Sequence, residues 1–163
     1  MRQVLIAVIL MCLSVSAGAN EAPTTQFIWD GSNRTEILRG GAQAGDPYAV
    51  ASAGKIFTAV AIAILVDEGR LDFDDPLSRW IDDDLLTPLH AEDVTLRQAL
   101  TMSSGIPDYF DEDFFDAVRG GDPKASTAAG ALSFATGQRR VCAPGKGFDY
   151  SNSNYLLAQL VIE

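Results

Sequence analysis

The sequence predicts an α+β fold in which one short β-hairpin precedes a series of helices, and three patterns carry this prediction. Two strand-type runs at residues 27–29 and 35–38 flank the turn-forming residues 30–33. An apolar run at residues 56–66 contains a single polar side chain, which is typical of a helix buried on every side. Another apolar helical run follows at residues 155–162.

Capping and turn residues set the limits of the elements between these runs. The first helix is expected to end before Gly69, which suits a C-terminal cap. A short helix is expected over residues 77–81. Thr95 is positioned to cap a helix over residues 96–102, and residues 127–136 have a helical composition.

The first residues have the pattern of a secretory signal peptide. Arg2 precedes an apolar stretch at residues 4–13, and the small residues Ala17-Gly18-Ala19 precede an expected cleavage before Asn20. The apolar stretch is too short to span a bilayer. We therefore expect residues 1–19 to be removed, and the mature protein to be secreted or periplasmic with no stable membrane span.

A lipoprotein signal is the alternative for this segment. Cys12 would then be the modified residue, although Met11 before it is bulkier than such signals normally tolerate. After signal cleavage only Cys142 remains, so we expect no internal disulfide. Residues 20–163 are expected to form one domain, which is stabilised by packing alone.

The chain is acidic, with 22 Asp and Glu residues against 12 Lys and Arg residues and a formal net charge of −10. This charge argues against nucleic acid and anionic membrane as partners. The acidic residues cluster in short runs without calcium-loop spacing, so we expect solvated loops and helix starts. With one histidine, His90, and one mature cysteine, no His/Cys metal site is expected, and the sequence indicates no cofactor.

Ser52 and Lys55 place a hydroxyl and an amine one helical turn apart at the start of the apolar run. Apolar surroundings and the positive end of the helix dipole both disfavour the ammonium form of a lysine there. Lys55 is therefore expected to accept a proton from Ser52 Oγ, which would make the serine nucleophilic without histidine. The alternative is a chance Ser-x-x-Lys on a solvated helix start.

A second motif, Tyr150-Ser151-Asn152, lies in a loop that leads into the last helix. Residues two apart in an extended backbone project to the same side, so the Tyr150 hydroxyl and the Asn152 amide are expected to face one cavity. The alternative is a capped turn, in which Asn152 or Ser153 caps the helix that follows.

In order and spacing, these motifs and the segments between them resemble the serine β-lactamase-related hydrolases, which include class C β-lactamases, D-alanyl-D-alanine carboxypeptidases and related esterases. The resemblance covers about residues 48–163, and its matching segments are Ser52-x-x-Lys55 and residues 66–77, 95–108 and 144–155. It implies a β-lactamase/transpeptidase-like fold, in which a sheet flanked by helices joins a helical domain and the active site lies between them.

The resemblance also implies a role for each motif residue. Ser52 would be the acylated nucleophile and Lys55 its activating base. Tyr150 would relay the proton to the leaving group, and Asn152 would hold the substrate amide. The Ser52 backbone N–H, at a helix start, is a suitable oxyanion donor. The expected substrate is a small molecule or peptide with an amide, lactam or ester to be cleaved.

The sequence departs from the family pattern in one major respect. It contains no Lys-Thr-Gly or His-x-Gly triplet, the third family motif, which normally lies well beyond position 163 on a sheet-edge strand. We therefore expect a partial chain that holds only the N-terminal hairpin of the sheet. A non-catalytic remnant that binds a ligand or partner is the alternative, and an unrelated helical secreted domain is a third. Gln98 and Met102 also stand where family members often have histidines.

Overall fold

The computed structural model describes residues 22–47 and 49–163, which belong to two compact units, Met1–Ala49 and Val50–Glu163. The signal-peptide prediction for residues 1–19 lies outside the described residues. Within the described part, no helix combines the length and the apolar character that a membrane crossing requires. Each unit is described below by itself.

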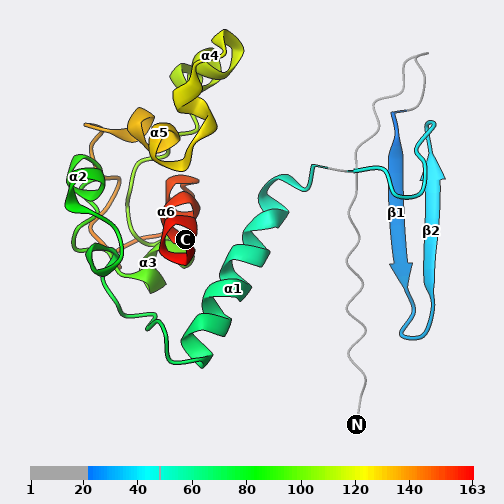
Figure 1. The fold of residues 1–163 in the computed structure, drawn as a ribbon, viewed down its shortest axis with the longest axis horizontal. Helices are drawn as coiled ribbons and strands as arrows, with labels where there is room; N and C mark the ends of the chain where they lie inside the picture. The colour runs from blue at the N-terminus through cyan, green and yellow to red at the C-terminus, as the bar shows by residue number, and fades with distance from the viewer. Residues whose placement is uncertain (1–21, 48) are drawn as a thin grey trace. The chain divides into compact units, whose positions relative to one another are not determined.

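The first unit contains the predicted hairpin. β1 (Thr24–Trp29) pairs antiparallel with β2 (Arg34–Arg39) (Figure 1). Trp29 lies opposite Arg34 beside the turn. The turn is closed by Asp30, whose Oδ1 accepts from the backbone N–H of Ser32 at 2.8 Å and of Asn33 at 2.7 Å. This is the way in which Asp side chains replace a backbone turn, so the hairpin follows directly from the local sequence.

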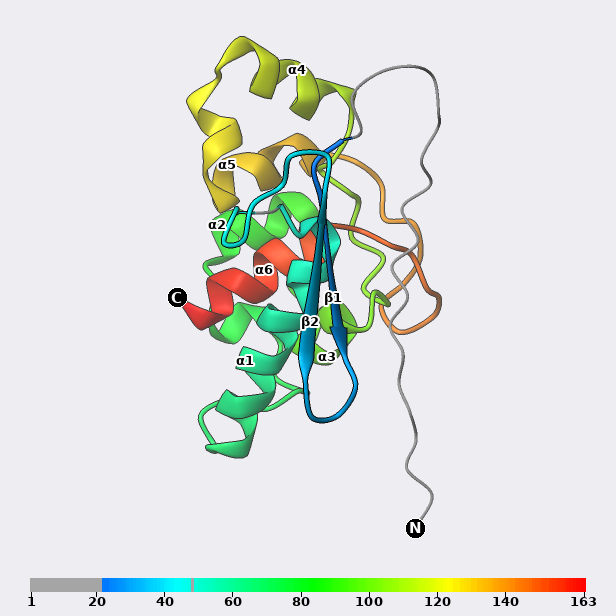
Figure 2. The same ribbon diagram turned by 90° about the vertical axis from the view of Figure 1, so that its right-hand side faces the viewer.

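The second unit is helical. Its elements are η1 (Ala51–Gly54), α1 (Lys55–Asp67), η2 (Leu77–Arg79), α2 (Asp83–Leu86), η3 (Thr87–Leu89), α3 (Leu96–Leu100), α4 (Glu112–Gly120), η4 (Pro123–Ser126), α5 (Ala128–Leu132), η5 (Ser133–Ala135) and α6 (Ser153–Ile162). α6 packs against α1, α3 and α5 (Figures 1 and 2). These helices contribute Ile62, Leu96, Leu132 and Leu157 to a core in which each is fully buried.

α1 differs from the expectation of a helix buried on every side. Among its residues only Ile62 is buried, whereas four large apolar side chains are more than half exposed: Ile56, Phe57, Val60 and Ile64. The physical reason is that α6 and the core cover α1 on one side. The apolar character of the exposed side is therefore left without a cover in Val50–Glu163.

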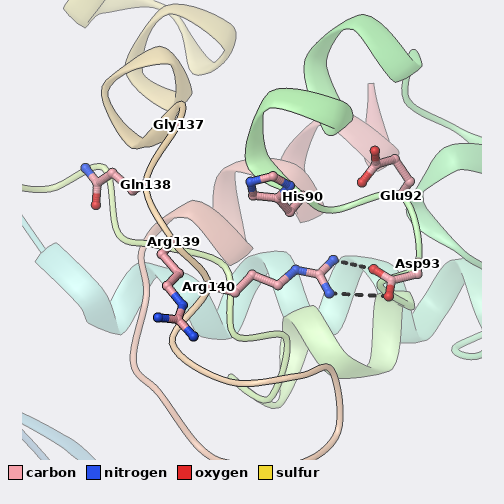
Figure 3. A pocket seen from close by; sticks show the side chains of 7 residues that line it. All are labelled: His90, Glu92, Asp93, Gly137, Gln138, Arg139 and Arg140. Atoms are coloured by element: carbon pink, nitrogen blue, oxygen red, sulfur yellow. Dashed lines mark hydrogen bonds and ion pairs between the residues drawn. The ribbon is translucent and has the colours of Figure 1, made fainter.

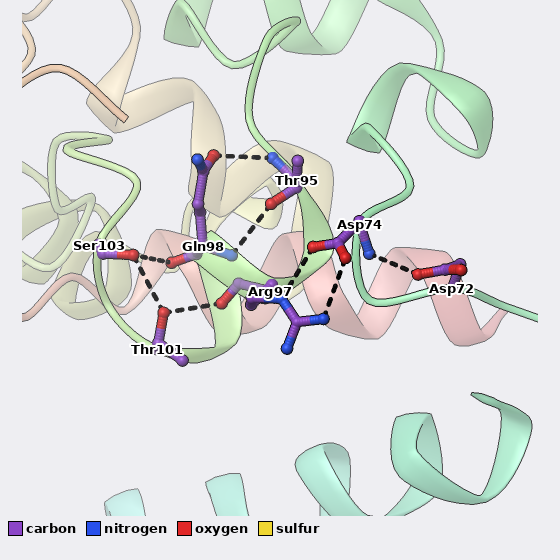
Figure 4. A network of polar contacts seen from close by, with 7 residues as sticks. All are labelled: Asp72, Asp74, Thr95, Arg97, Gln98, Thr101 and Ser103. Atoms are coloured by element: carbon purple, nitrogen blue, oxygen red, sulfur yellow. Dashed lines mark hydrogen bonds and ion pairs between the residues drawn. The ribbon is translucent and has the colours of Figure 1, made fainter. Parts of the chain in front are cut away.

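α3 is fixed by polar contacts that the sequence predicted in part. Thr95 caps the helix as expected, in a reciprocal capping box: the Gln98 N–H donates to Thr95 Oγ1 at 3.3 Å, and Gln98 Oε1 accepts from the Thr95 N–H at 3.0 Å (Figure 4). Arg97 donates two hydrogen bonds to Asp74, of 2.8 and 3.1 Å. They tie the segment around Asp74 to α3 and lower the pKa of Asp74.

Other predicted helices are shorter or interrupted. The helix expected over residues 77–81 is a 3-10 turn of three residues, and the helix expected over residues 127–136 is divided into α5 and η5. α4 lies in one of the acidic runs that were expected to form loops or helix starts. Asp111 caps its N-terminus, where Oδ1 accepts from the Phe114 N–H at 3.0 Å.

Candidate active site

The side chains of Ser52, Lys55 and Tyr150 meet in one hydrogen-bonded group. Lys55 Nζ donates to Ser52 Oγ at 3.1 Å, and the Tyr150 hydroxyl donates to the same oxygen at 2.8 Å. Lys55 Nζ also lies 5.2 Å from the centre of the Tyr150 ring. Ser52 and Lys55 come from adjacent turns of η1 and α1, whereas Tyr150 is almost a hundred residues away in the sequence. A nucleophile within reach of two proton-transfer groups is the arrangement that serine acylation requires.

Asn152 completes the group, and its role differs from the alternative of a helix cap. It occupies the N-cap position of α6, but its side chain makes no capping hydrogen bond. Instead, Asn152 Oδ1 accepts from Lys55 Nζ at 2.7 Å, and Nδ2 donates to Asp108 Oδ2 at 2.9 Å. The expectation that Tyr150 and Asn152 face the same cavity therefore agrees with the geometry.

The pKa of Tyr150 responds to its hydrogen-bonding neighbours in the site. The hydrogen-bonding interaction with Lys55, followed by that with Ser52, lowers the pKa of Tyr150 below its ordinary value of 10.0. Tyr155 shows the opposite behaviour, because burial raises its pKa even though Lys55 Nζ lies 5.7 Å from its ring. Among the described tyrosines Tyr150 is therefore the one whose pKa the surroundings lower.

The four predicted residues line one cavity of about 470 Å³, together with Ala51 and Phe110. Ala51 has a positive φ of 45°, a strained conformation for a residue with a Cβ, directly before Ser52. Ser52 is exposed at the cavity, and Tyr150 is 47% exposed. The Ser52 hydroxyl is therefore accessible to a small molecule that enters the cavity.

The sequence did not single out Asp108 and Phe110, although Asp108 lies within a segment that carries the family resemblance. Phe110 brings an aromatic wall to the cavity and packs edge-on against Tyr109, with ring centres 5.9 Å apart. The available signal was the position of both residues just after Pro107, which ends the extended loop behind α3. The spacing of a motif does not tell which of its residues line the cavity, as Phe110 does, and which contact a lining residue, as Asp108 does.

A second cavity, of about 570 Å³, lies elsewhere on the helical unit (Figure 3). It is lined by His90, Glu92, Asp93, Gly137, Gln138, Arg139 and Arg140. Arg140 forms an ion pair with Asp93, which lowers the pKa of that carboxyl. The lining contains no hydroxyl or thiol nucleophile. Across the described residues, no three His, Cys, Asp or Glu side chains are gathered as metal ligands would be.

Comparison with known proteins places this geometry in a family. The family model described as Beta-lactamase matches residues 27–163. Protein flp of Staphylococcus aureus strain N315 is 33% identical over 117 residues, which are 71% of this chain and 22% of that protein. Penicillin-binding protein 4* of Bacillus subtilis strain 168 is 30% identical over 116 residues, which are 71% of this chain and 24% of that protein.

Solved structures agree with these relatives. A D-stereospecific amidohydrolase from Streptomyces sp. superimposes with a TM-score of 0.70 at 31% identity, covering 82% of this chain and 41% of that one. The penicillin-binding protein from Bacillus halodurans gives a TM-score of 0.58 at 37% identity, covering 71% of this chain and 33% of that one.

These matches confirm the predicted fold class. The neighbours have the β-lactamase/transpeptidase fold, and the hairpin and helices described here are its N-terminal part. The chain spans about a quarter of the length of the curated relatives named above. Because the family model matches residues 27–163, this chain belongs to the β-lactamase family of serine hydrolases, and it carries the N-terminal part of the family's fold.

Proposed function

We propose that this chain carries the nucleophile and the proton-transfer residues of an exported serine hydrolase, which cleaves an amide, lactam or ester through an acyl-enzyme. One observation carries the proposal: Ser52 Oγ accepts hydrogen bonds from both Lys55 Nζ and the Tyr150 hydroxyl, and all three residues line one cavity. The roles that the family resemblance implies for these residues fit this geometry.

Acylation proceeds by the transfer of one proton in two stages. Lys55, as the neutral amine, takes the proton of Ser52 Oγ, while the oxygen attacks the substrate carbonyl carbon and forms a tetrahedral intermediate. The Ser52 N–H stabilises the oxyanion. Tyr150 then gives its proton to the departing nitrogen or oxygen and regains one from Lys55, so that the carbonyl–leaving-group bond breaks and acyl-Ser52 remains. Water reverses the sequence, which releases the acid and restores Ser52.

The remaining donor is Asn152. Because its Oδ1 is occupied by Lys55 and one Nδ2 hydrogen by Asp108, the second Nδ2 hydrogen is available to a carbonyl of the substrate. Among the neighbours, the D-amino acid amidase from Ochrobactrum anthropi SV3, at 25% identity and a TM-score of 0.64, was solved with D-phenylalanine. A small acyl compound derived from an amino acid is therefore a suitable first substrate.

The proposal is tested by turnover in the full-length protein. Nitrocefin, a peptide ending in D-alanyl-D-alanine and a p-nitrophenyl ester represent the lactam, amide and ester classes. We expect turnover of at least one of them, with loss of turnover in Ser52→Ala. Ser78→Ala is the matched control, because Ser78 is an exposed serine that hydrogen-bonds the Glu92 carbonyl outside the cavity. Turnover that survives Ser52→Ala would refute the proposal.

Export is part of the same proposal and is supported by the pattern of residues 1–19 alone. It predicts that the mature protein, isolated from the periplasm or the medium, begins at Asn20. Intact mass measurement checks this directly. A mass that retains Met1 or a lipid on Cys12 would contradict it.

A non-catalytic protein that only binds a ligand or partner is the second candidate. The exposed apolar face of α1, with Ile56, Val60 and Ile64, is the observation that favours it, because such patches mark interaction surfaces. Binding of a substrate analogue without any acylation of Ser52 in the full-length protein would decide in its favour.

A further inference from the structure

Asp108 holds Asn152 at both its backbone and its side chain. Asp108 Oδ1 accepts from the Asn152 backbone N–H at 2.9 Å, and Oδ2 accepts from Asn152 Nδ2 at 2.9 Å. The same Oδ1 also accepts from the Phe110 N–H at 3.2 Å. Both carboxylate oxygens are therefore used to fix residues that line the cavity around Ser52.

Only one orientation of the Asn152 amide satisfies its two neighbours. A carboxylate offers acceptors alone, and Lys55 Nζ donates a hydrogen to Asn152. Nδ2 must therefore face Asp108, and Oδ1 must face Lys55, as it does at 2.7 Å. Turning the amide over would place donor against donor at Lys55 and acceptor against acceptor at Asp108. Asp108 thus determines which atom Asn152 presents to Lys55.

The backbone around Asp108 is itself held by buried side chains. The Pro107 carbonyl accepts from Ser151 Oγ at 3.2 Å and from Ser153 Oγ at 2.6 Å. Ser153 Oγ in turn accepts from the Tyr109 N–H at 3.1 Å. Both serines are fully buried. The carboxylate is therefore presented from a segment tied on both sides to the chain that carries Asn152, so it has little freedom to move away.

We propose that Asp108 is a positioning residue for acyl transfer: it fixes the Asn152 amide with Oδ1 on Lys55 and one Nδ2 hydrogen free for the substrate. This inference rests on the proposed function of the site. Asp108 does not line the cavity, so the proposed effect on the reaction passes through Asn152, which does.

The first test replaces Asp108 by its isostere. In Asp108→Asn, an amide nitrogen competes with an oxygen for the place opposite Asn152 Nδ2, so the fixed orientation is lost. We expect the rate at which a fluorescent penicillin or fluorophosphonate acylates Ser52 in the full-length protein to fall by about 10- to 100-fold, the usual cost of a misplaced catalytic contact. Unchanged acylation in this variant would overturn the proposal.

Asp111→Asn is the matched control. Asp111 is a neighbouring carboxylate of similar partial burial that caps α4 through the Phe114 N–H, and asparagine caps a helix equally well. Its acylation rate is expected to equal that of the wild type. An equal loss in both variants would show a general effect of charge and would overturn the proposal.

A double-mutant cycle separates positioning from a structural role. If Asp108 acts only through Asn152, Asp108→Asn causes no further loss of acylation once Asn152→Ala has removed the amide. Fold-losses that multiply in the double variant would show that Asp108 acts by another route, and would overturn the proposal.

A readout without catalysis distinguishes this inference from the proposed function. The side-chain NH₂ of Asn152, observed by NMR, should exchange slowly with solvent in the wild type because one hydrogen is donated to Asp108. Asp108→Asn should shift this signal and speed its exchange, and Asp111→Asn should not. An unchanged signal would overturn the proposal. Failure of wild-type Ser52 to acylate, with the expected NMR change, would refute only the proposed function.

Discussion

The cavity around Ser52 has two walls that are held in different ways. The helix wall consists of Ser52 and Lys55, at the start of a helix in which only Ile62 is buried. The loop wall consists of Tyr150 and Asn152, and Asp108 holds Asn152 in place. These residues come from segments joined by fully buried serines and asparagine. In the proposed mechanism, the helix wall supplies the nucleophile and its base, and the loop wall supplies the tyrosine proton donor and the amide that holds the substrate. Precision at this site therefore comes from polar contacts in the loops more than from packing of the helix.

The largest expected effect concerns the cover of the helix wall. Full burial of an apolar side chain contributes about 1.5–3 kcal/mol, so the four half- to three-quarters-exposed side chains on α1 forgo at most about 6–12 kcal/mol. This upper bound is comparable to the whole stability of a domain. We expect residues 20–163, expressed alone, to bind a hydrophobic dye and to show neither a cooperative thermal transition nor turnover. A cooperative melt with turnover that Ser52→Ala abolishes would show that this part is sufficient.

Removal of the base tests the helix wall within the full-length protein. Lys55→Ala should slow acylation of Ser52 by about 10²- to 10⁴-fold, the range for loss of a positioned proton acceptor. The rate of labelling by a fluorescent penicillin measures this. Labelling at the wild-type rate would remove Lys55 from the mechanism.

The loop wall should show a smaller loss. Tyr150→Phe and Asn152→Ala are each expected to lower turnover by about 10²-fold without unfolding the protein, because both side chains face the cavity. Tyr109→Phe is the control, since its ring packs 4.9 Å from that of Phe114 outside the cavity lining. Near-normal turnover in both loop-wall variants would show that the loop is a structural turn without a role in turnover.

The buried polar contacts behind the loop wall should be measurable as stability. Ser104 Oγ donates to Asn154 Oδ1 at 2.5 Å, and both side chains are fully buried. Ser104→Ala leaves that oxygen without its donor, which should lower the free energy of unfolding by about 1–3 kcal/mol. The exposed Ser78→Ala should change it by less than about 0.5 kcal/mol. Equal stability of the Ser104 variant would show that the loop wall does not depend on this contact.

The smallest expected effect is a change in the pKa of Tyr150, on the loop wall, caused by Lys55, on the helix wall. Because Lys55 is the largest cause that lowers the pKa of Tyr150, Lys55→Ala should raise that pKa towards 10.0. A lowered folded pKa favours the phenolate, so its stabilising contribution is present above 10.0 and is lost as pH falls through the lowered value. Ultraviolet difference titration, with Tyr150→Phe as the blank, measures the ionisation. A transition that does not move in Lys55→Ala would contradict the coupling.

The sequence predicted the elements whose signal is local. The hairpin follows from Asp30 in its turn, and the start of α3 follows from Thr95 and Gln98. Ser52, Lys55, Tyr150 and Asn152 were predicted by motif, and the structure brings them together, although their catalytic roles remain predictions.

What the sequence missed depends on long-range contacts. The apolar run of α1 indicates a buried helix, but the side that is covered is decided by α6, about a hundred residues later. Asp108 was quoted in a motif without a role, because its contact with Asn152 exists only once the two loops meet. Asparagine is a residue type that often caps helices. The Asn152 side chain makes no capping hydrogen bond because it is hydrogen-bonded to Lys55 and Asp108 instead.

The central claim is that Ser52 is the acylated nucleophile, and peptide mapping by mass spectrometry tests it most directly. The full-length protein is incubated with a penicillin or fluorophosphonate, digested, and searched for the adduct. The account predicts one acyl or phosphonyl adduct, on the peptide that contains Ser52, and none in Ser52→Ala. An adduct on another residue, or an adduct that persists in Ser52→Ala, would contradict it.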